Sequence, residues 1–146
     1  MVDSNCYQGY LMAGLCYEKL ENVEKSIENY ELAHETKPEE ALPNKQLYLI
    51  YKKEKEFQKA AEYVENIVDI LEPKTDKIEQ YSDYAMKLLE VYEYSMDIQK
   101  AYAFFLKVIE RKDLKDQVKA EACRVYFKLV MEDHKLEFSL QLWNNK

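Results

Sequence analysis

The chain has 146 residues, a length that suits one domain with a sizeable core, and its formal net charge is −7. Its two Gly and three Pro leave almost no material for hairpins, phosphate-binding glycine loops or flexible linkers. Glu, Lys, Leu, Ala and Tyr dominate, and apolar residues recur every three or four positions, so the sequence predicts an all-helical fold.

In chain order, the apolar spacing predicts eight helices in four helix–turn–helix pairs. The pairs span approximately 5–38, 40–72, 76–111 and 115–145. In the first pair, Asp3 or Ser4 can cap the first helix, a tight turn follows at 21–22, and Pro38 ends the second helix.

The second half of the chain has clear signals for the starts of helices. Asp76-x-x-Glu79 has capping-box spacing and predicts the start of the fifth helix, and Asp97 is the expected cap of the sixth. The seventh helix is expected over about 115–132 and the eighth over about 135–144, which leaves a break between them.

The predicted pairs repeat a pattern of small and aromatic residues. The first copy reads Tyr10-x-x-Ala13-Gly14-x-x-Tyr17, then Ser26, Tyr30, Ala33 and Pro38. A second copy follows 34 residues later as Tyr48-x-x-Tyr51, Ala60, Val64, Ile67 and, one place late, Pro73. A third lies 41 residues further on, at Leu89-x-x-Tyr92, Ala101, Phe105 and Val108, and a degenerate fourth 38 further, at Phe127-x-x-Val130, Ser139 and Trp143. We expect the small residues to mark close approaches between paired helices.

This pattern resembles the tetratricopeptide repeat (TPR), which reads W-x2-L-G-x2-Y, then A-x3-F, then P over 34 residues. The resemblance implies a single domain over 1–146, a right-handed α-solenoid of about four pairs, either complete or cut from a longer array. It also implies a protein–protein interaction scaffold that binds a peptide or a partner helix in a concave groove or at the array ends. The alternative is a peptide-sensing regulatory domain that controls a fused or partner effector domain.

Repeat register assigns residues to the groove formed by the first helix of each pair. The predicted partner-binding residues are Leu11, Met12, Leu15, Lys45, Leu49, Lys52, Met86, Lys87, Arg124 and Lys128. The apolar N-terminal end and the basic middle predict a partner segment with apolar and acidic side chains. At the C-terminal end, Leu140 and Trp143 predict an apolar face that is either covered by further repeats or forms a contact, for example in a homodimer.

The remaining residues predict no catalytic, cofactor or metal site. No nucleophile motif, HExxH or glycine-rich loop is present, and His34 and His134 lie far apart in the sequence. An acidic chain is a poor match for nucleic acid, and no apolar run approaches the roughly 18 residues of a membrane span. Three cysteines without CxxC spacing suit a reducing compartment, the cytoplasm or nucleus, where a buried free cysteine packs as a small hydrophobe.

Overall fold

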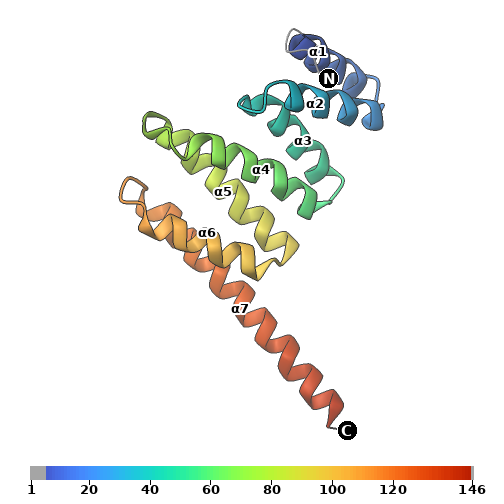
Figure 1. The fold of residues 1–146 in the computed structure, drawn as a ribbon. Coiled ribbons are helices and arrows are strands. Elements are labelled where there is room, and N and C mark those ends of the chain that lie inside the picture. Colours follow the sequence, from blue (N-terminus) through green and yellow to red (C-terminus); the bar gives the residue numbers. More distant parts are fainter. Residues whose placement is uncertain (1–5, 146) are drawn as a thin grey trace. The chain divides into compact units, whose positions relative to one another are not determined.

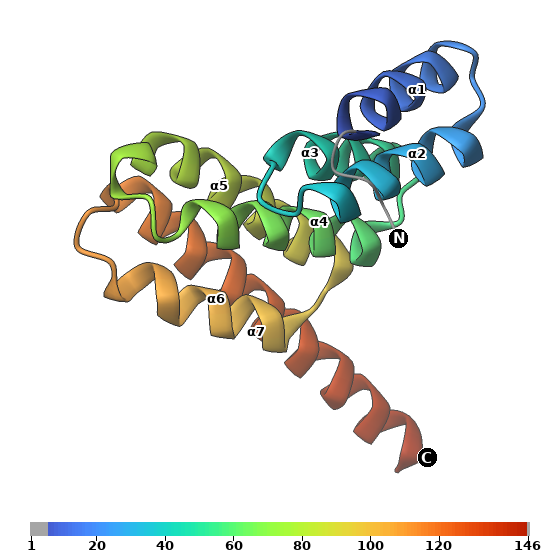
Figure 2. The same ribbon diagram turned by 45° about the horizontal axis from the view of Figure 1, so that its top comes forward.

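The computed structural model describes residues 6–145, and within this range it contains α-helices, one short 3-10 turn and no strand (Figures 1 and 2). The elements are α1 (Tyr7–Lys19), α2 (Val23–Thr36), α3 (Ala41–Lys53), α4 (Phe57–Leu71), η2 (Thr75–Lys77), α5 (Ile78–Ser95), α6 (Ile98–Glu110) and α7 (Asp116–Asn144). The all-helical class is confirmed, whereas the predicted count of eight helices is wrong by one. The predicted cap at Asp3 or Ser4 lies outside the described residues.

The chain divides into two compact units, Met1–Lys77 with α1 to α4 and Ile78–Lys146 with α5 to α7. We call them unit 1 and unit 2 and describe each by itself.

Three turns between helices repeat the same backbone geometry. Glu21, Lys55 and Met96 are the non-glycine residues with positive φ in the described range, at 58°, 60° and 56°. The amide that follows each of them donates to the carbonyl oxygen of a repeat tyrosine, namely Tyr17, Tyr51 and Tyr92. Each of these bonds closes a Schellman motif, in which the residue just after the helix adopts a left-handed backbone conformation. The turns are 34 and 41 residues apart, which matches the spacing of the sequence repeat.

In unit 1, α1 and α2 pack closely at Gly14. A Cβ atom at this position would lie 2.6 Å from Tyr30 Cε1, and the Ser26 hydroxyl donates to the Gly14 carbonyl oxygen at 2.9 Å. Tyr30 is fully buried and its hydroxyl donates to Glu18 Oε2 at 2.8 Å. Small residues therefore do mark the close helix approach, and a tyrosine fills the space beside them.

A partly buried polar network joins α2, α3 and α4. Asn44, fully buried in α3, accepts from Asn66 Nδ2 of α4 at 3.0 Å through its Oδ1. Its Nδ2 lies 3.2 Å from Nδ1 of His34 in α2. Each polar atom named here has a partner, as buried amides require. His34 therefore has a structural contact that links neighbouring helix pairs.

The core of unit 1 includes the residues that the second repeat copy predicts. Tyr48, Tyr51, Ala60, Val64 and Ile67 are all buried. Full burial of a large apolar side chain contributes roughly 1.5–3 kcal/mol, so this cluster supplies much of the stability of the pair. The cysteines differ from expectation, since Cys6 and Cys16 are exposed and do not pack as small hydrophobes.

In unit 2, the predicted seventh and eighth helices form one continuous helix, α7. The sequence from 116 to 144 holds neither Gly nor Pro, so nothing forces the backbone to turn at 133–134. The buried stripe of α7 is Val118, Ala122, Val125 and Leu129, and α7 packs against both α5 and α6. The fourth repeat copy does not match the buried face of α7, because Phe127 is exposed and Val125 is buried.

The C-terminal half of α7 extends beyond α5 and α6 (Figures 1 and 2). From Met131 to Asn145 every side chain is exposed except the half-buried Glu132. We call this segment, 131–145, the α7 extension.

Candidate partner-binding surfaces

The predicted groove residues of α1 differ widely in exposure. Met12 is exposed and Leu15 is half-buried, as a contact surface needs. Leu11 is buried, because it lies one helical turn from Tyr7 and Gly14 on the face of α1 that enters the core. The assignment of Leu11 to an open groove is therefore wrong.

The predicted residues of α3 point to a more accessible face. Lys45 and Leu49 are exposed, whereas Lys52 is half-buried, with its Nζ 5.7 Å from the centre of the Tyr48 ring. An ammonium group over an aromatic face is stabilised by the ring quadrupole. Lys52 is thus engaged within its own helix.

One pocket of unit 1 includes a predicted groove residue, Leu49. It has a volume of about 300 Å³ and is lined by Glu18, Glu21, Val23, Leu49, Ile50, Lys53 and Glu54. The end of α1, the start of α2 and the end of α3 form its walls. Of the groove residues predicted from the sequence, Leu49 lines this pocket.

In unit 2, the predicted residues of α5 are half-buried. Met86 and Lys87 are both partly covered, and Lys87 Nζ lies 4.8 Å from the centre of the Tyr84 ring. As with Lys52, the ammonium group contacts the ring of a tyrosine on the same helix.

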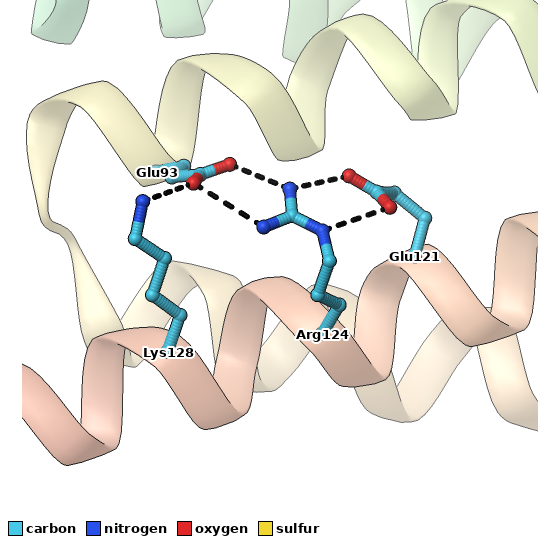
Figure 3. Close-up of polar contacts among 4 residues, drawn as sticks. All are labelled: Glu93, Glu121, Arg124 and Lys128. Atoms are coloured by element: carbon cyan, nitrogen blue, oxygen red, sulfur yellow. Dashed lines mark hydrogen bonds and ion pairs between the residues drawn. The ribbon is translucent and has the colours of Figure 1, made fainter.

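The basic residues of α7 are paired with carboxylates of unit 2 (Figure 3). Arg124 Nη2 lies 2.9 Å from Glu93 Oε2 on α5 and 2.6 Å from Glu121 Oε1 on α7. Lys128 Nζ lies 2.6 Å from the other oxygen of Glu93. Two cations therefore share one carboxylate, and the predicted basic surface is neutralised at this end.

These contacts shift the pKa of Glu93, the carboxylate that the two cations share. Hydrogen bonds from Arg124, and then from Lys128, lower the pKa of Glu93 against the opposing effect of its burial. The same contacts raise the pKa of Lys128, with the Glu93 hydrogen bond as the main cause. The network stays charged at neutral pH and holds α5 against α7.

The sequence did not reveal that Glu93 forms ion pairs. The contacts of Glu93 with α7 cross 31 and 35 residues of chain, so no helical i,i+3 or i,i+4 spacing reveals them. The within-helix pair Glu121–Arg124 had such a spacing and could have been read from the sequence.

The residues predicted to form an interface at the C-terminal end are exposed to solvent. Leu140 and Trp143 both lie exposed on the α7 extension. Across residues 6–145, no group of three or more His, Cys, Asp or Glu side chains is arranged to hold a metal ion. None of the helices in this range combines the length and apolar character that a membrane crossing needs.

Comparison with known proteins supports the fold class. No protein-family model matches the chain, and no curated protein matches its sequence. Among solved structures, the N-terminal domain of stress-induced protein-1 (STI-1) from C. elegans is similar, with a TM-score of 0.62 and 14% identity. The match covers 84% of this chain and 95% of that domain. At this identity the similarity establishes a common helical fold and nothing about activity.

Proposed function

We propose that the chain is a TPR-like interaction scaffold and that unit 1 binds a segment of a partner protein at the α1–α3 pocket. The observation that carries the proposal is this pocket, in which an exposed leucine lies among apolar and charged groups. Leu49 is 44% exposed and shares the pocket with Val23 and Ile50. The repeated Schellman turns and the similarity to a helical domain support the TPR assignment.

The charges around the pocket favour one kind of segment. Three carboxylates, Glu18, Glu21 and Glu54, line it together with one cation, Lys53. An apolar anchor flanked by Lys or Arg fits this environment better than the segment with apolar and acidic side chains that was expected from the sequence. The acidic preference depended in part on Arg124 and Lys128, which are paired with Glu93.

The compartment we propose is the reducing cytoplasm. Cys6 and Cys16 are free, exposed thiols. Exposed thiols persist where glutathione and thioredoxin keep them reduced.

Selection from a random peptide library on the intact protein tests the proposal. We expect the selected peptides to share an apolar residue next to Lys or Arg. Calorimetric titration of a selected peptide should then show a loss of affinity of about tenfold or more on Leu49→Lys, as expected when an anchor contact is lost.

The chain supplies a matched control on the same helix. Leu42 is 42% exposed, close to the value for Leu49, but it does not line the pocket. Leu42→Lys makes the same change of charge and should leave the affinity within about twofold. Equal losses for the two variants, or selected peptides rich in Asp and Glu, would contradict binding at this pocket.

A further inference from the structure

The apolar stripe that packs α7 into unit 2 continues past the point where the unit covers it. Leu129, the last buried residue of the stripe, is followed seven residues later by Leu136, and then by Leu140 and Trp143. Steps of seven, four and three keep these residues on one helix face. All three of the later residues are exposed, and Trp143 is 75% exposed.

A largely apolar pocket lies at the boundary between the covered and the uncovered part of the stripe. Its volume is about 540 Å³, and its apolar walls come from Met96, Ile98, Leu129 and Leu136. The other residues that line it are Glu132, Asp133, Lys135 and Ser139. Leu136 in the pocket wall and the exposed Trp143 therefore lie on the same face of α7, separated by about two turns.

We propose that the α7 extension is a self-association surface and that its occupant is a second copy of this chain, paired antiparallel. Leu136 lies midway between Leu129 and Trp143, seven residues from each. A two-fold axis at Leu136 therefore places Trp143 of the partner subunit against Leu129, at the pocket, and does the same in the other direction. A closed two-fold contact requires this kind of self-complementary patch.

The distribution of charge favours the antiparallel arrangement. The charged groups of the extension, Glu132, Asp133, Lys135 and Glu137, all lie in its first half, whereas 138–145 carries none. Antiparallel overlap places the uncharged end of one copy against the charged start of the other. Parallel overlap would bring the carboxylates of the two copies together, which costs energy.

The available area suits a weak but specific dimer. Trp143, Leu136 and Leu140 expose on the order of 400 Å² per copy, so that two copies with the pocket walls approach the roughly 1,000 Å² of a specific interface. Aromatic residues that enter an apolar pocket dominate such contacts.

The single tryptophan of the chain makes the test local, because Trp143 reports its own environment. We expect sedimentation velocity of the full chain between about 1 µM and about 1 mM to show a monomer–dimer equilibrium. The emission of Trp143 should shift to shorter wavelength over the same concentration range. A chain that stays monomeric, or a dimer that forms without this shift, would overturn the proposal.

Two leucines provide a matched pair of variants. Leu140 is 53% and Leu142 is 52% exposed, but two residues correspond to about 200° of helix, so Leu142 lies on the opposite face. Leu140→Glu should weaken dimerisation by about tenfold or more, because a carboxylate at 140 would face the carboxylates at the start of the partner's extension, and Leu142→Glu should weaken it by less than about threefold. Both substitutions are on the surface, and equal helical circular dichroism checks that folding is unchanged. A larger loss for Leu142→Glu, or equal losses, would overturn the assignment of the face.

Discussion

The ring of Tyr30 occupies the space that a side chain at Gly14 would need. A Cβ atom there would lie 2.6 and 2.7 Å from two ring carbons, closer than non-bonded atoms approach. The ring cannot move aside at low cost, because Tyr30 is fully buried and its hydroxyl is bonded to Glu18. The distance between α1 and α2 is therefore set by the absence of a side chain at one position.

We expect Gly14→Ala to destabilise unit 1 by about 1–3 kcal/mol, as overpacking does, even though alanine is the better helix former. Urea unfolding measures the change. Gly9 is the control, since it lies in the same helix and a Cβ atom there would meet nothing within 4 Å. Gly9→Ala should stabilise by about 0.5–1 kcal/mol, and the same sign for both variants would contradict the close contact.

At Lys55, where the backbone is left-handed, we expect a substitution to stabilise the protein. The φ of 60° at Lys55 is strained for a residue with a Cβ, and its side chain is exposed. Lys55→Gly should stabilise the chain by about 0.5–1 kcal/mol in thermal or urea unfolding. Lys45→Gly, an exposed lysine inside α3, should instead destabilise by about 1 kcal/mol. Destabilisation by both would mean that residue 55 does not adopt this turn.

Glu93 should link the stability of unit 2 to pH. Because its folded pKa is lowered, its contribution is complete above the ordinary glutamate pKa of about 4.3 and is lost as pH falls through the folded value. At pH 7 we expect Glu93→Gln to destabilise by about 0.5–1 kcal/mol, since the partly exposed partners are screened by solvent. Near pH 3, below the ordinary glutamate pKa, the difference should be smaller than at pH 7.

Unfolding curves at the two pH values measure this effect, with Glu79→Gln as the control. Glu79 also pairs with a cation of unit 2, Lys115, at 3.0 Å, but both side chains are about two-thirds exposed or more. Its substitution should cost less than about 0.5 kcal/mol at either pH. A loss for Glu93→Gln that does not depend on pH would show that the ion pairs are not its cause.

The sequence was informative where side-chain size controls packing. The small residues Gly14, Ser26 and Ala60 and the repeat tyrosines predicted the helix pairs of unit 1, and their spacing matches the turns. The chemistry of the binding partner was harder to predict. The sequence pattern does not distinguish a groove lysine that faces solvent from one that forms an ion pair within the protein, as Lys128 does with Glu93. That pairing depends on the contact between α5 and α7, which no local spacing encodes.

The break predicted in α7 failed for a different reason. Residues 132–135 are charged and polar, which is typical of a turn, but all of them are also compatible with a helix when no Gly or Pro intervenes. The register error that placed Phe127 in the core hid the stripe that links Leu129 to Leu136. With the correct register, the stripe itself predicts a continuous helix.

A proline at His134 tests that continuity directly. In a continuous helix it removes a backbone hydrogen bond and clashes with the preceding turn, which costs about 3 kcal/mol locally. We therefore expect His134→Pro to lower the helical circular dichroism signal, while His134→Ala leaves it unchanged. In the wild-type chain, the Cα chemical shifts of 131–137 should be helical without interruption. If a turn separated two helices at 133–134, proline would fall near the start of the second helix, where it is tolerated, and the signal would persist.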